Sequence, residues 1–142
     1  MNTNEATFPG GSYRITREEN LALCKAVGTE PDATGLAHPI FYFIASQVGM
    51  GLTVAELCAR CDFDVADGPL MTRSDAEFEG ELRIDTDYDV SGEILSLVRK
   101  PSRTFGAVDV LTYRLRLDSS QNDGSVVTTN QWMLPRRQEN QS

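Results

Sequence analysis

Residues 110–117 (VLTYRLRL) alternate strictly between apolar and polar side chains from Leu111 onward. Successive side chains of a β-strand point to opposite faces of a sheet, so this alternation predicts a strand with one apolar face. That face consists of Leu111, Tyr113, Leu115 and Leu117. Such a face must be covered by a second layer, and the rest of the chain has to supply it.

Two more segments are typical of strands, residues 88–99 (YDVSGEILSLVR) and 126–134 (VVTTNQWML). Before them, the apolar spacing predicts helices over residues 17–27, 39–48 and about 53–60. In the second of these helices Phe41, Ile44, Ala45 and Val48 fall on one stripe. Helices followed by antiparallel strands favour an α+β fold, in which the sheet wraps around the apolar helix at 39–48.

The expected helix starts have recognisable capping signals. Thr16 and Glu19, and again Thr53 and Glu56, have the spacing of a capping box. Pro39 suits a first helical turn, where its missing N–H costs little. These signals place the helices within one domain over residues 13–137, with a flexible arm at 1–12 and a polar tail at 138–142. Residues 99–103 (RKPSR) and 119–125 (SSQNDGS) are expected to be the turns between the strands.

Composition excludes several classes of partner. The chain has 142 residues and a formal net charge of −8, which disfavours nucleic acid as a partner. It holds no run of roughly 20 apolar residues, so no membrane span is expected. The polar N-terminus lacks a signal-peptide pattern, and the three cysteines fit reduced thiols. We therefore expect a cytoplasmic protein.

No metal or cofactor site is expected. Cys24, His38, Cys58 and Cys61 could form a zinc set, but their spacing matches no common motif. Residues 61–90 carry ten acidic and two basic side chains. The segments 62–68 and 85–89 lack the glycine and glutamate positions of a calcium loop, so an acidic surface is predicted. No phosphate-binding loop or dinucleotide fingerprint is present.

Residues 99–103 form the densest basic cluster, with Arg99, Lys100 and Arg103. They could contact the phosphates of a nucleotide-bearing ligand. The alternative is an ordinary turn whose charges favour solubility, and the sequence weights this alternative more heavily.

Several segments in order resemble the MaoC-like hot-dog family, especially the N-terminal halves of fatty-acid-synthase-type dehydratases. They are residues 26–28 (AVG), 37–49 (AHPIFYFIASQVG), 77–94 (EFEGELRIDTDYDVSGEI), 103–117 (RTFGAVDVLTYRLRL) and 131–137 (QWMLPRR). The resemblance implies a hot-dog fold, a homodimer or heterodimer, and acyl thioesters of coenzyme A or acyl carrier protein as ligands. Active members hydrate enoyl thioesters or dehydrate 3-hydroxyacyl thioesters.

The chain departs from the family's catalytic signature, G-D-x-N-P-[LIV]-H. After residue 28 it reads Thr29, Glu30, Pro31 and Asp32, and the signature's histidine is missing. His38 matches a histidine at the start of the central helix. Pro39 matches a glycine whose N–H binds the thioester oxygen in the family, and proline has no N–H.

The resemblance therefore implies a catalytically depleted subunit that shapes the acyl pocket of a catalytic partner. Phe41, Tyr42 and Ile44 are then expected to line the pocket, with His38 at its mouth and capping or packing at the helix start. Two alternatives stay open. The chain could be a self-sufficient homodimeric hydratase that uses Asp32 and His38 as an acid–base pair. It could also be a binding module for acyl thioesters without a lyase partner, or more weakly a thioesterase.

Overall fold

The structure, a computed structural model, describes residues 6–119 and 125–137. Its helices are α2 (Arg17–Ala26), α3 (Phe41–Gly49) and α4 (Val54–Arg60), followed by a short 3-10 helix η1 (Val65–Asp67). Its strands are β1 (Gly11–Arg14), β2 (Leu70–Phe78), β3 (Asp87–Ser102), β4 (Gly106–Ser119) and β5 (Ser125–Arg137).

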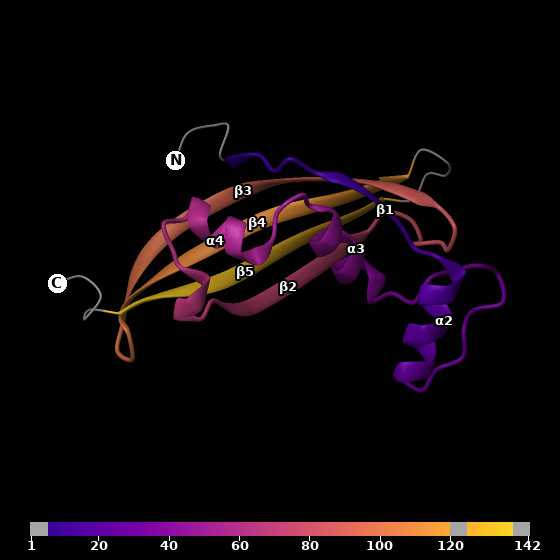
Figure 1. Ribbon diagram of the computed structural model, residues 1–142, viewed down its shortest axis with the longest axis horizontal. Helices are drawn as coiled ribbons and strands as arrows, with labels where there is room; N and C mark the ends of the chain where they lie inside the picture. Colours follow the sequence, from indigo (N-terminus) through magenta and orange to yellow (C-terminus); the bar gives the residue numbers. More distant parts are fainter. Residues whose placement is uncertain (1–5, 120–124, 138–142) are drawn as a thin grey trace.

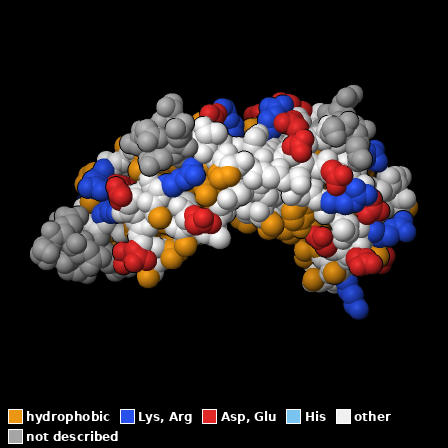
Figure 2. All heavy atoms as spheres, turned by 45° about the horizontal axis from the view of Figure 1, so that its top comes forward, with side chains coloured by type: hydrophobic (Ala, Val, Ile, Leu, Met, Phe, Trp, Pro, Cys, Tyr) orange, Lys and Arg blue, Asp and Glu red, His pale blue; other side chains and the backbone are white. Residues whose placement is uncertain are grey.

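The five strands form one antiparallel sheet in the order β1-β3-β4-β5-β2. Helices α3 and α4 lie against one face of this curved sheet, and α2 lies beyond one of its ends (Figure 1). The whole molecule is bent like an arch, with hydrophobic side chains gathered along its hollow underside (Figure 2). The sheet thus wraps around α3, as the α+β prediction expects.

The core forms where α3 meets the centre of the sheet. The predicted face of β4 is fully buried, whereas Arg114 and Arg116 on its other face are exposed. Phe41 and Ala45 of α3 join the same core. Gly49 allows α3 to approach β3, because a Cβ atom at residue 49 would lie only 2.5 Å from Cγ2 of Val90.

The predicted helices agree with the structure to within a few residues. Helix α2 ends at Ala26, and the Thr16 side chain accepts the N–H of Glu19 at 3.1 Å. The capping box of Thr53 and Glu56 is complete at the start of α4. Helix α3 spans 41–49 rather than 39–48, because residues 39 and 40 form a turn that precedes it.

Two strands were not predicted. Strand β2 lies in the acidic segment and is an edge strand that pairs with β5, so it shows little apolar alternation. Strand β1 pairs with the start of β3. The predicted position of the turn at residues 99–103 is also wrong. Strand β3 continues to Ser102, and the turn covers residues 103–105.

The chain termini lie partly outside the described residues. Within the expected arm at 1–12, Phe8 is buried and its N–H donates to the carbonyl of Gly92. The described part of this arm, residues 6–12, therefore packs on the sheet. The predicted tail at 138–142 and residues 120–124 of the predicted turn fall outside the described part. Over the described residues no single helix is long and apolar enough to cross a membrane; only α3 and α4 together have the length and composition, and they are bent by 63°.

Candidate functional site

His38 lies directly before α3 and is fixed at two points. Its main-chain N–H donates to Oδ1 of Asn20, a buried side chain of α2, at 2.8 Å. Its imidazole Nδ1 accepts the N–H of Ile40 at 3.1 Å. These contacts tie His38 to α2 and to Ile40, the residue directly before α3.

The start of α3 has no main-chain donor left for a ligand. Pro39 has no N–H. The N–H of Ile40 is taken by the His38 ring, and the N–H of Phe41 donates to the carbonyl of His38 at 3.0 Å. The next N–H, of Tyr42, donates to the carbonyl of Pro39 at 3.0 Å. An oxygen atom placed at this helix start would find every local N–H engaged.

Asp32 organises the loop that precedes His38. One of its carboxylate oxygens, Oδ2, accepts the N–H of Thr34 at 2.8 Å, the N–H of Leu36 at 3.2 Å and the hydroxyl of Thr34. The hydroxyl and these two N–H groups lower the pKa of Asp32 below its usual value, with a further contribution from Arg83. A carboxylate stabilised in this way is a weaker base than an unbonded one. Its hydrogen bonds go to its own loop and not to His38.

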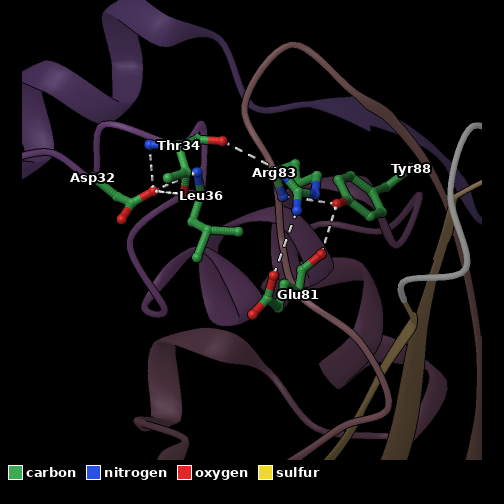
Figure 3. Close-up of polar contacts among 6 residues, drawn as sticks. All are labelled: Asp32, Thr34, Leu36, Glu81, Arg83 and Tyr88. Carbon is green, nitrogen blue, oxygen red and sulfur yellow. Dashed lines mark hydrogen bonds and ion pairs between the residues drawn. The ribbon is translucent and has the colours of Figure 1, made fainter.

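A second loop packs against the Asp32 loop (Figure 3). Arg83 donates from its side chain to the carbonyl of Thr34 at 3.4 Å and forms an ion pair with Glu81 at 3.5 Å. The hydroxyl of Tyr88 accepts the N–H of Arg83 at 2.9 Å and donates to the carbonyl of Glu81. Two main-chain hydrogen bonds also join the loops. The N–H of residue 37 donates to the carbonyl of residue 82 at 2.8 Å, and the N–H of residue 84 donates to the carbonyl of residue 35 at 3.0 Å.

Two adjoining clefts open around these loops. The His38 cleft has a volume of about 310 Å³ and is lined by Cys24, Thr29, Glu30, Asp32, Leu36, Ala37, His38 and Pro39. The Phe78 cleft has a volume of about 270 Å³ and is lined by Leu36, Ala37, Pro39, Phe78, Gly80, Glu81 and Leu82. The clefts share Leu36, Ala37 and Pro39, so they lie side by side around the loop before α3.

The structure brings together only some of the residues predicted from the sequence. Asp32 and His38 line the same cleft.

Of the residues predicted to line the pocket, Phe41 is buried in the core, and Ile44 packs against the core. The Tyr42 hydroxyl lies 3.2 Å from Oγ of Ser74, and its ring meets Phe78 edge-on at 6.2 Å. Tyr42 thus contacts a lining residue of the Phe78 cleft, Phe78 itself.

Arg99, Lys100 and Arg103 belong to the end of β3 and the turn that follows it. This turn lies at the opposite end of the sheet from α2 (Figure 1). Arg99 is bound there to Asp109, whose carboxylate it contacts at 2.8 Å and 3.2 Å. Lys100 and Arg103 are exposed.

The three cysteines are all buried. Burial raises the pKa of Cys61 to about 11, so its thiol stays protonated at neutral pH. In the described part of the chain, no three side chains among His, Cys, Asp and Glu are grouped so that they could hold a metal ion.

Sequence reasoning missed Asn20 and Phe78. Asn20 lies four residues before Cys24 on the inward face of α2, and a polar residue on that face was the available signal. Phe78 ends a strand that was not predicted, so its position beside Pro39 depends on the pairing of β2 with β5.

No protein-family model matches the chain, and no curated protein is similar to it in sequence. Several solved structures are similar in fold. A chain of the ChsH1–ChsH2 complex from Mycobacterium tuberculosis matches with 11% identity and a TM-score of 0.72, over 96% of this chain and 92% of that chain. A chain of the HadBC 3R-hydroxyacyl-ACP dehydratase complex from the same organism matches with 14% identity and a TM-score of 0.63, over 90% and 93%. The MaoC-like dehydratase from Rhodospirillum rubrum matches with 13% identity and a TM-score of 0.62, over 92% and 91%.

The chain therefore has the hot-dog fold, as the sequence resemblance implied. Thioesterases with this fold are also similar to it, so the likeness alone does not select one activity.

Proposed function

We propose that the chain is the substrate-shaping, catalytically depleted subunit of an enoyl-thioester hydratase or 3-hydroxyacyl-thioester dehydratase. The observation that carries this proposal is the start of α3, where Pro39 lacks an N–H and the N–H groups of Ile40 and Phe41 are engaged. A catalytic site for this chemistry needs donors aimed at the oxygen on which charge develops. A second hot-dog chain with an intact catalytic signature would supply them.

Two further observations support the same role. Two of the similar solved structures are complexes of two different chains, and one of these is a 3R-hydroxyacyl-ACP dehydratase. Within this chain, Asp32 is committed to its own loop through three donors, which leaves it poorly suited to act as a base.

The partner is expected along β2, which is an edge strand of the described sheet. Leu70 and Phe78, near its two ends, are 50% and 46% exposed although both are large and apolar. Exposed edges of this kind are usually paired or covered. Phe78→Glu should therefore disrupt the complex, as measured by analytical ultracentrifugation. Val27→Glu is the matched control, because Val27 is a similarly exposed apolar residue at the end of α2.

The purified chain alone should not hydrate crotonyl-CoA. Coexpression with a small protein from the neighbouring reading frame that carries an intact G-D-x-N-P-x-H signature should yield a stable, active complex. Turnover by the isolated chain at the rate of the complex would overturn the proposal.

A self-sufficient hydratase is the second candidate, because Asp32 and His38 line one cleft. It requires that the isolated chain hydrates crotonyl-CoA and that His38→Ala abolishes the activity. Binding of acyl-CoA without turnover or any partner would instead indicate a binding module.

A further inference from the structure

The imidazole of His38 is engaged at one nitrogen and open at the other. Nδ1 accepts the N–H of Ile40. In the described part of the chain, the one buried side-chain nitrogen or oxygen without a hydrogen-bond partner is Nε2 of Gln47. Nε2 of His38 has no hydrogen-bond partner among the described residues, and it is therefore accessible from the cleft side or from solvent.

The hydrogen bond from Ile40 fixes which nitrogen carries the proton. A ring nitrogen that accepts a hydrogen bond bears no proton, so the proton of the neutral ring is on Nε2. His38 consequently offers a donor at its open end rather than a lone pair. In this geometry it is suited to bind a hydrogen-bond acceptor and unsuited to remove a proton.

The charge around His38 restricts the kind of acceptor. Glu30 and Asp32 line the same cleft, whereas Glu81 of the adjoining cleft is paired with Arg83. The hydrogen bonds that lower the pKa of Asp32 keep it ionised at neutral pH. Glu30 and Asp32 would repel a carboxylate ligand, whereas they would not repel a neutral carbonyl oxygen.

The lining of the adjoining Phe78 cleft indicates which kind of group the carbonyl of such a ligand carries. Leu36, Phe78 and Leu82 give the Phe78 cleft an apolar lining directly beyond Pro39. Its volume of about 270 Å³ suits a short acyl chain. A ligand with an apolar chain and a neutral carbonyl at one end would match both clefts at once.

We propose that Nε2–H of His38 binds the carbonyl oxygen of a neutral acyl ester or thioester, whose chain enters the Phe78 cleft. This inference rests on the proposed function and deepens it, because it makes His38 a binding residue that selects thioesters over free acids.

Two substitutions at residue 38 separate the donor from the helix cap. His38→Asn retains an acceptor for the N–H of Ile40, since asparagine caps an N–H two residues ahead, but it removes the distal donor. His38→Gln retains a distal amide donor and loses the short-range acceptor. The probes are hexanoyl-N-acetylcysteamine, a thioester without phosphates, and hexanoate, titrated into the full chain and followed by NMR.

The chain should bind the thioester, and hexanoate more weakly. His38→Asn should weaken thioester binding roughly fivefold with an unchanged Tm, as expected for one hydrogen bond. His38→Gln should keep the affinity within about twofold and lower the Tm. The proposal is wrong if the unsubstituted chain does not bind the thioester, if hexanoate binds equally well, or if His38→Asn binds like the unsubstituted chain.

A charge variant tests the selectivity independently. Glu30→Gln should narrow the difference in affinity between the thioester and hexanoate, because one of the repelling charges is gone. An unchanged ratio would show that Glu30 does not contribute to the selection.

The outcomes for this site and for the proposed function can be told apart. If the chain binds the thioester through His38 and also hydrates crotonyl-CoA by itself, the inference holds and the proposed function is wrong. If the chain is inactive and His38→Asn leaves binding unchanged, the proposed function holds and this inference is wrong.

Discussion

Each end of the β-sheet holds an aspartate with hydrogen-bond donors around it, but the two sites differ in burial and in their partners. Asp109 has a side chain that is only 6% exposed, and it is bound by both Arg99 and Arg136. Asp32 is exposed and is bound by the hydroxyl and main-chain N–H groups of its own loop.

The two sites also differ in what they connect. Arg136 lies over the ring of Phe63 at 5.3 Å and donates to the carbonyls of Cys61 and Asp62, so the Asp109 cluster ties β5 to the end of α4. Asp32 shapes a loop beside an open cleft. The buried Asp109 cluster therefore links elements of the fold, whereas the exposed Asp32 loop borders a cleft that a ligand can enter.

The largest expected effect comes from breaking the Asp109 cluster. Asp109→Asn removes the negative charge that compensates Arg136, whose side chain is 17% exposed. Removal of one partner from a buried ion pair should cost about 3 kcal/mol in the free energy of unfolding. Urea denaturation measures this loss. Asp75→Asn is the control, because the exposed Arg73–Asp75 pair should contribute less than about 1 kcal/mol.

The same cluster should make the stability sensitive to acid. Burial raises the pKa of Asp109, but the two guanidinium groups lower it by more, so its pKa in the folded chain is below the usual value. The contribution is then complete above the unfolded-state pKa of about 3.9 and is lost as the pH falls through the lower folded-state value. The difference in stability between the unsubstituted chain and Asp109→Asn should stay constant from about pH 5 to 7 and shrink below about pH 4. A constant difference at all pH values would contradict this account.

Asp32→Ala should have a smaller, local effect. The substitution releases the N–H groups of Thr34 and Leu36, so these two amides should exchange with solvent faster. The Tm should fall by less than it does for Asp109→Asn. Equal falls in Tm for the two variants would mean that both ends of the sheet are equally important for stability.

The smallest effect is expected from the exposed basic residues at the far end. Lys100→Gln combined with Arg103→Gln should leave the affinity for hexanoyl-CoA and for hexanoyl-N-acetylcysteamine unchanged. Both residues belong to the β3–β4 turn region, which lies at the opposite end of the sheet from α2, the helix bonded to the main chain of His38 (Figure 1). A selective loss of affinity for the coenzyme A thioester would instead support phosphate contacts by this cluster, the possibility that the sequence left open.

Local patterns predicted much of the fold. The alternation in β4 and the capping of α2 and α4 depend on residues that are close in sequence, so their geometry follows from side-chain spacing. The stripe predicted for α3 is only partly right, because Phe41 and Ala45 are buried but Val48 is 67% exposed. Strand β2 was missed because its conformation depends on pairing with β5, about 55 residues further along the chain.

In the candidate site, too, some features follow from the local sequence and others from contacts between distant segments. The sequence drew attention to His38 and Pro39, and the lack of an N–H at Pro39 is a covalent property that needs no structure. It could not place Phe78 beside Pro39, because that position depends on the pairing of β2 with β5.

The sequence by itself determined the α+β class, the apolar helix that the sheet wraps and the absence of a donor at residue 39. The tertiary structure decided which polar groups find hydrogen-bond or ion-pair partners within the chain. Asp109 meets an arginine 27 residues away, and the main chain of His38 meets Asn20, 18 residues away. Such pairings arise only when distant segments pack together, since a side chain's hydrogen-bonding capacity is known from its type but its partners are set by the fold.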